Sequence, residues 1–103
     1  MAVVILDSNN FKEEVLDAKG KVFVDFYADW CGPCRMMGPV VEELADELKD
    51  VKICKINVDS AEDIARNYDV MSIPTFILFE DGNIKNKIVG GRSKEEMAEW
   101  IRG

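Results

Sequence analysis

Two cysteines separated by two residues are the most reactive feature of this sequence. Cys31 and Cys34 follow an apolar run from Val22 to Ala28, and Pro33 lies between them. Proline suits the first turn of a helix, so we expect the pair where a strand gives way to a helix. Free amides and the helix dipole at that position favour a thiolate at Cys31, the attacking species in disulfide exchange. Cys34, one turn further along, can then close a disulfide and release what Cys31 has captured.

Two other interpretations of this pair are weaker. Zinc usually takes four Cys or His ligands, whereas the chain has no histidine and only one further cysteine, Cys54. A purely structural disulfide is typical of exported proteins. The early apolar run from Ala2 to Leu6 is too short for a signal or membrane segment. We therefore expect a cytoplasmic protein in which the pair does redox chemistry.

A carboxylate inside the apolar run is the second unusual feature. Alternation along a strand places Phe23, Asp25 and Tyr27 on one face. Burial there should raise the pKa of Asp25 towards neutrality. With no histidine in the chain, Asp25 is the candidate group to take the proton of Cys34. The plainer alternative is a buried carboxylate paired with Lys55 on the next strand.

Length and charge limit the classes of partner. The 103 residues suffice for one domain, residues 1–103, and are too few for two. The chain has 13 Lys and Arg against 20 Asp and Glu, a net charge of −7, and the positive residues are scattered. We expect no nucleic-acid partner, because nothing in the chain could replace the counterions of a polyanion. No membrane association is expected either, because the early apolar run is too short.

The hydrophobic pattern alternates between strands and helices. Strands are predicted at residues 3–6, 21–28, 51–59, 75–80 and 86–89, and helices at residues 8–16, 33–49, 60–68 and from 93 onwards. Pro39 should kink the second helix. Segments 60–63 and 93–96 both resemble capping boxes. These elements predict an α/β fold with a mixed sheet between helices, the second strand in its middle.

Taken together, these motifs resemble the thioredoxin family. Trp30 to Cys34 reads Trp-Cys-Gly-Pro-Cys, which is similar to the active-site signature of that family. The similarity spans nearly the whole chain and includes Asp25, Pro39, Lys55, Ile73-Pro74-Thr75 and Val89-Gly90-Gly91. It implies a thioredoxin fold, with a central mixed five-stranded sheet flanked by four helices. Tyr27 departs from the pattern, since tryptophan is common there, and Ser72 stands where glycine or serine occurs.

The resemblance also implies a set of site residues. Catalytic roles fall to Cys31, Cys34, Asp25 and Lys55, and the Ile73-Pro74 bond is expected to be cis and to face the cysteines. A shallow surface would bind an extended substrate segment through its backbone; it comprises Trp30, Gly32, Pro33, Ile73, Pro74, Gly90 and Gly91. Trp30 could instead pack in the core, and the proline and glycines could serve ordinary turns. Cys54 is either a core residue or a regulatory thiol.

The function implied by these residues is reduction of disulfides in target proteins. A thioredoxin reductase would return the oxidised pair to the dithiol, no cofactor would be bound, and the protein would be a monomer. An oxidase or isomerase is the second possibility, although Gly32-Pro33 supplies no cation to stabilise the reduced form. The third is a binding module in which the thiols are incidental.

Overall fold

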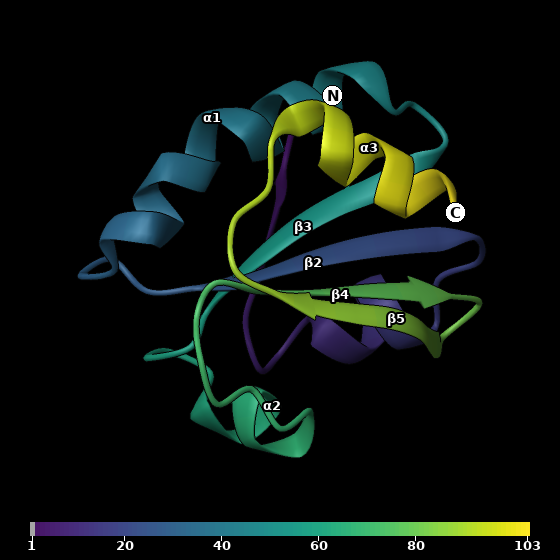
Figure 1. Cartoon of the computed structure of the whole chain (residues 1–103). Coiled ribbons are helices and arrows are strands. Elements are labelled where there is room, and N and C mark those ends of the chain that lie inside the picture. The colour runs from purple at the N-terminus through teal and green to yellow at the C-terminus, as the bar shows by residue number, and fades with distance from the viewer. Residues whose placement is uncertain (1) are drawn as a thin grey trace.

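A mixed sheet of five strands organises the chain, of which the computed structural model describes residues 2–103. The strand order is β1-β3-β2-β4-β5 (Figure 1). The strands are β1 (Val4–Leu6), β2 (Lys21–Tyr27), β3 (Val51–Asn57), β4 (Thr75–Glu80) and β5 (Asn83–Val89). β3 runs parallel to β1 and β2, whereas β4 is antiparallel to β2 and β5. The predicted α/β class and the mixed sheet are confirmed.

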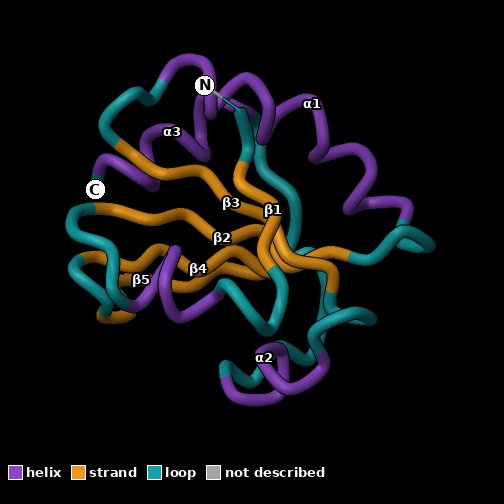
Figure 2. The backbone as a smooth tube through the Cα atoms, turned by 180° about the vertical axis from the view of Figure 1, so that it is seen from behind, coloured by secondary structure: helices purple, strands orange, loops and turns teal. Residues whose placement is uncertain are grey.

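Four helices cover the two faces of this sheet, as the resemblance implied. They are η1 (Lys12–Leu16), α1 (Gly32–Glu47), α2 (Glu62–Asn67) and α3 (Lys94–Arg102). In both views α1 and α3 lie on one side of the sheet and α2 on the other (Figures 1 and 2). Within residues 2–103, no helix combines the length and apolar character needed to cross a membrane.

The central strand β2 supplies both hydrophobic cores. Phe23 faces α1 and α3 and stacks on Phe76 with ring centroids 5.5 Å apart. Val24 and Phe26 face the opposite way, into the core that η1 and α2 cover. This alternation explains the unbroken apolar run, since both faces of a central strand are covered. Asp25 therefore lies on the α1 side of the sheet.

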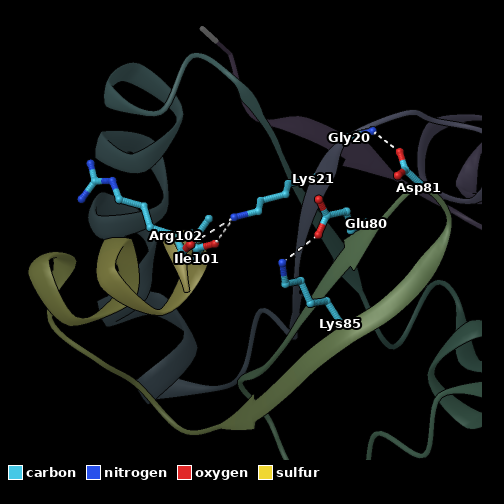
Figure 3. Close-up of polar contacts among 7 residues, drawn as sticks. All are labelled: Gly20, Lys21, Glu80, Asp81, Lys85, Ile101 and Arg102. Carbon is cyan, nitrogen blue, oxygen red and sulfur yellow. Dashed lines mark hydrogen bonds and ion pairs between the residues drawn. The ribbon is translucent and has the colours of Figure 1, made fainter.

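Polar contacts tie together the end of the sheet near the β4–β5 turn. Lys21 Nζ donates to the carbonyl oxygens of Ile101 and Arg102, at 2.9 and 3.3 Å, and so satisfies the C-terminus of α3. The Gly20 amide donates to Asp81 Oδ1 at 2.8 Å (Figure 3), and the Asp81 amide donates to the Gly20 carbonyl at 3.0 Å. We call this group, Gly20, Lys21, Asp81 and the last residues of α3, the hairpin end.

Two predicted helix starts differ from the structure, while a third is confirmed. The capping box expected at residues 60–63 is absent, because α2 begins after Ala61 without a side-chain cap. Asp63 Oδ1 instead accepts a hydrogen bond from Ser8 Oγ at 2.6 Å. The capping box of α3 is present, with reciprocal bonds between Ser93 and Glu96.

The first helix also starts differently from the prediction. Its cap was expected at residues 8–10, but the N-cap is Phe11, which makes no side-chain cap hydrogen bond. Asp7 Oδ1 accepts from the amides of Asn9 and Asn10, at 2.8 and 3.0 Å, in the turn before the helix. The helix that follows, η1, is a short π-helix. Among the strands, β5 begins at Asn83 rather than at residue 86, because it pairs with β4 directly from the turn.

Candidate active site

The cysteine pair lies at the junction predicted for it. β2 ends at Tyr27, Cys31 is the N-cap of α1, and Pro33 occupies the first turn of that helix. A disulfide joins Cys31 to Cys34, with their Cα atoms 5.2 Å apart. The Cys34 amide donates to Cys31 Sγ at 3.2 Å. The same amide is placed to stabilise a thiolate at Cys31 once the disulfide is reduced.

A loop distant in sequence closes over the sulfur atoms. Cys31 and Cys34 are each only 5% exposed, and Ile73 packs against them. Cys31 Sγ lies 3.9 Å from the carbonyl oxygen of Ile73, and the Ile73-Pro74 bond is cis, as the resemblance implied. The Pro74 carbonyl accepts a hydrogen bond from the Gly90 amide at 2.8 Å. Three separate segments of the chain thus meet around the disulfide.

Trp30 lies on the surface next to this junction. Its side chain is 69% exposed, so the alternative of a core packing role is wrong. Its Nε1 donates to Asp59 Oδ2 at 2.9 Å, and the Asp59 amide in turn donates to Asn57 Oδ1 at 2.9 Å. This contact holds an exposed aromatic ring in place. Asp59 was not predicted as a site residue, and no sequence pattern points to it.

The glycines of the predicted surface differ in what they allow. Gly90 has a φ of +95°, a conformation that side chains rarely adopt. A Cβ at Gly91 would lie 3.3 Å from Met37 Sδ, so the backbone there packs closely on α1. Gly32 is different, because a Cβ at that position would meet nothing within 4 Å. Gly32 and the exposed Pro33 leave the outer side of the junction open.

A cavity of about 310 Å³ lies behind the disulfide and reaches Asp25. We call it the Asp25 cavity; its lining comprises Asp25, Tyr27, Ala28, Asp29, Cys34, Arg35, Gly38, Val41, Glu42 and Lys55. Asp25 is 3% exposed, and its Oδ1 has no hydrogen-bond partner within residues 2–103. Burial raises the pKa of this carboxyl to about 7, against the opposing charge of Lys55. Asp25 and Cys34 therefore share one cavity.

Lys55 does not form the ion pair that a simple buried carboxylate would need. The two residues are directly opposite each other on β2 and β3. The ammonium of Lys55 nevertheless lies over the Tyr27 ring, 5.4 Å from its centroid. Lys55 lowers the pKa of Asp25 through its charge alone. The alternative of a paired carboxylate is therefore corrected to an unpaired one with a cation nearby.

Cys54 lies away from the site. It is fully buried between β1 and β2, opposite Val4 and Val24, on the face of the sheet that η1 and α2 cover. Burial raises the pKa of its thiol to about 12. These surroundings favour the core role over the regulatory one.

Sequence reasoning missed four residues of α1 that line the Asp25 cavity: Arg35, Gly38, Val41 and Glu42. Arg35 Nη1 also donates to the Asp29 carbonyl at 2.9 Å and so fixes the loop before Cys31. Helical spacing was the available signal. Residues 34, 38 and 41 or 42 follow one another on one helix face, so a cavity next to Cys34 has to meet them.

Comparison with known proteins agrees with this geometry. The family model described as Thioredoxin matches residues 2–103. A thioredoxin of Chlamydia pneumoniae is 50% identical over 99 residues, which cover 96% of this chain and 95% of that protein. A thioredoxin of Pseudomonas aeruginosa is 41% identical over 100 residues, covering 96% and 93%. One of Rickettsia felis is 43% identical over 102 residues, covering 98% and 96%. The chain therefore belongs to the thioredoxin family.

Proposed function

We propose that this thiol-disulfide oxidoreductase reduces disulfides in other proteins, with Cys31 as the attacking and Cys34 as the resolving cysteine. The observation that carries the proposal is the Cys31–Cys34 disulfide at the N-terminus of α1, where the Cys34 amide donates to Cys31 Sγ at 3.2 Å. A thiolate at Cys31 gains a hydrogen bond and a favourable helix dipole, whereas Cys34 lies inside the cavity.

The reaction consists of two successive thiol-disulfide exchanges. The Cys31 thiolate attacks one sulfur of the target disulfide, that S–S bond breaks, and a mixed disulfide forms. Asp25 in its carboxylate form takes the proton of Cys34. The Cys34 thiolate then attacks Cys31 Sγ and displaces the bound target sulfur as a thiolate. The target gains two electrons, and the protein is left with the Cys31–Cys34 disulfide.

Substrate contacts are assigned to the surface around the disulfide. Trp30 presents an exposed ring, and Gly32 and Pro33 leave the approach to Cys31 open. The backbone at Ile73-Pro74 and at Gly90-Gly91 would pair with an extended segment of the target, a mode that demands little of its side chains. Lys55 would act with Asp25 beneath this surface.

The partners are disulfide-containing target proteins and a thioredoxin reductase that restores the dithiol. We further propose that residues 1–103 act as a single thioredoxin domain and a monomer. A cytoplasmic location fits this direction of electron flow, because thiols are kept reduced there.

A redox titration with mass labelling tests the direction of the reaction. The protein is equilibrated in graded thiol-disulfide buffers, quenched with acid, alkylated in denaturant and weighed intact. The reduced chain should carry three labels, one for each cysteine. Two labels should be lost together near about −270 mV, the established potential of thioredoxin itself.

Other outcomes would contradict the proposal. A transition nearer about −180 to −120 mV would indicate an isomerase or oxidase. Three labels at every potential would mean that no working couple exists and would favour a binding module. Cys54→Ser is the matched control, since it should lose one label throughout and leave the potential of the pair unchanged.

A further inference from the structure

The ammonium of Lys55 has two possible partners on the neighbouring strand. Asp25 lies directly opposite Lys55 in the register of β2 and β3, and Tyr27 lies two residues further along the same face. Lys55 Nζ is found 5.4 Å from the centre of the Tyr27 ring. That distance lies within the range of about 6 Å over which an aromatic face attracts a cation. The ring, rather than the carboxylate, contacts the ammonium.

The position of this ammonium matters because Lys55 is the charge that opposes the effect of burial on Asp25. Its Oδ1 is buried and unpartnered among residues 2–103. A lysine in direct contact with a carboxylate stabilises the charged form strongly, by about 1 to 3 pKa units for a close opposite charge. A shift of Lys55 from the ring to the carboxylate would therefore change which form of Asp25 is present at neutral pH.

Among the charged and titratable groups around Asp25, Lys55 is the one that favours the ionised carboxylate. The charged and titratable residues that line the cavity come from β2, β3, α1 and the loop between β2 and α1: Tyr27, Lys55, Cys34, Arg35, Glu42 and Asp29. Arg35 Nη1 donates to the Asp29 carbonyl. Cys34 is held in the disulfide in this structure. Lys55 is the group whose charge opposes the effect of burial on Asp25.

We propose that Tyr27 is a positioning residue, whose ring holds the Lys55 ammonium out of hydrogen-bond contact with Asp25 so that the carboxyl can both keep and accept a proton beside Cys34. The inference rests on the function proposed above for Asp25 and adds Tyr27 as the residue that controls how readily this carboxyl is protonated. Proton transfer from the Cys34 thiol gives a thiolate and a neutral Asp25. An Asp25 that was salt-bridged to Lys55 would be a poorer acceptor, because its charged form would be stabilised.

The test measures the Asp25 carboxyl directly, by carbon-13 NMR of the oxidised protein over pH 4 to 9. The chain has no histidine, so few other groups titrate in this range. In Tyr27→Leu the ring is lost, Lys55 can reach Asp25, and the titration midpoint should fall by about one pH unit. Tyr27→Phe and Tyr27→Trp keep an aromatic face and should stay within about 0.3 unit of the parent protein.

A second background separates this effect from better hydration of the cavity. Lys55→Met removes the charge and keeps the apolar stem. In that background Tyr27→Leu should move the midpoint by less than half as much as it does when Lys55 is present. The pH profile of disulfide turnover should move in the same direction as the NMR midpoint. Tyr27→Met serves as a second ring-free variant if Tyr27→Leu does not fold.

Two results would overturn the inference. One is an unchanged Asp25 midpoint in a folded Tyr27→Leu or Tyr27→Met protein. The other is a full-sized shift that persists with Lys55→Met. Failure of the proposed function would look different, because the redox titration would then show no two-thiol transition, or Asp25→Asn would leave the pH profile of turnover unchanged.

Discussion

The two ends of β2 carry charged side chains in opposite circumstances. At the hairpin end, Lys21 donates to the last carbonyl oxygens of α3 and Asp81 accepts from the Gly20 amide (Figure 3). At the other end, Asp25 is buried and its Oδ1 has no hydrogen-bond partner among residues 2–103. The active-site end also exposes a large apolar side chain, since Trp30 beside the cysteines is 69% exposed.

This contrast separates groups that stabilise the fold from groups that do chemistry. A buried carboxyl without a partner costs stability, and such groups concentrate at functional sites. The hydrogen-bonded carbonyls and carboxylate at the hairpin end contribute stability, and they do not line the cavity beside the disulfide. Substitutions at the two ends should therefore affect different measurements, and those at the active-site end can even stabilise the protein.

The largest effect is expected from Cys31→Ser, which should lower disulfide turnover by at least about 10³-fold because the attacking sulfur is lost. The fold should survive, since serine is a good N-cap for α1. The measurement is dithiothreitol-driven reduction of a disulfide-containing protein, with stability compared between reduced samples. Cys34→Ser is the matched variant and should accumulate a mixed disulfide at Cys31. Turnover within tenfold of the parent in Cys31→Ser would contradict the assignment.

Asp25→Asn should give the next largest effect, a gain of stability above neutral pH. The pKa of Asp25 is about 7 in the folded protein, against an ordinary value of 3.8 for this side chain. As pH rises from about 4 to 7, the unfolded chain loses this proton while the folded protein keeps it, so the free energy of unfolding falls. The loss reaches at most about 4 kcal/mol.

Asp25→Asn removes that loss, so its advantage over the parent should be greatest above pH 7 and vanish near pH 4. Urea unfolding of the oxidised proteins at several pH values measures it. Asp81→Asn at the hairpin end is the control, because asparagine keeps the acceptor for the Gly20 amide and tolerates the φ of 52° at that position. Parallel pH curves for Asp25→Asn and the parent would refute the prediction.

Gly82→Ala, in the β4–β5 turn next to Asp81, should destabilise the protein by about 3 kcal/mol or more. Gly82 has a φ of +83°, and a Cβ there would collide with the backbone of Leu16. The redox potential of the cysteine pair should not change. Gly38→Ala is the matched control in α1, where a Cβ meets nothing within 4 Å, and should stabilise by about 0.5–1 kcal/mol. Equal effects of the two changes would show that backbone conformation does not decide the outcome.

Lys21→Met should give the smallest effect, a loss of about 1 kcal/mol from the hydrogen bonds to the Ile101 and Arg102 carbonyls. Thermal or urea unfolding measures that loss. Turnover and its pH profile should stay within about twofold of the parent, because Lys21 has no contact with the Asp25 cavity. A clear change in the pH profile would mean that the two ends of β2 are coupled.

The sequence predicts those features of β2 and the active site that depend on residues close together in the chain. The apolar run of β2 predicts a central strand, and Pro33 after Cys31 predicts a helix start, since both signals lie within a few residues of the feature itself. The burial of Asp25 follows from its neighbours Phe23 and Tyr27 in the same way. Such local signals were sufficient for the fold and for the place of the cysteines.

Contacts between distant segments were not predictable in this way. The expected cap of α2 failed because Asp63 binds Ser8, which lies 55 residues away in the chain. The partner of Trp30, Asp59, is 29 residues away. Met36 was grouped on the same helix surface as the buried Met37, yet it is 79% exposed. Side-chain partners of this kind depend on how the elements pack, which one sequence does not specify.

The buried thiol of Cys54 can report local unfolding of the protein, because it reacts only when it becomes exposed. In the reduced native protein this thiol is buried in the core that η1 and α2 cover, and its raised pKa leaves almost no thiolate at neutral pH. A reagent can reach it only when the core between the sheet and the helices η1 and α2 opens. The rate at which Cys54 gains a label, compared with the labelling of Cys31, therefore reports how often this core opens. Any variant described above that keeps Cys31 and Cys54 can be timed in this way without adding a probe.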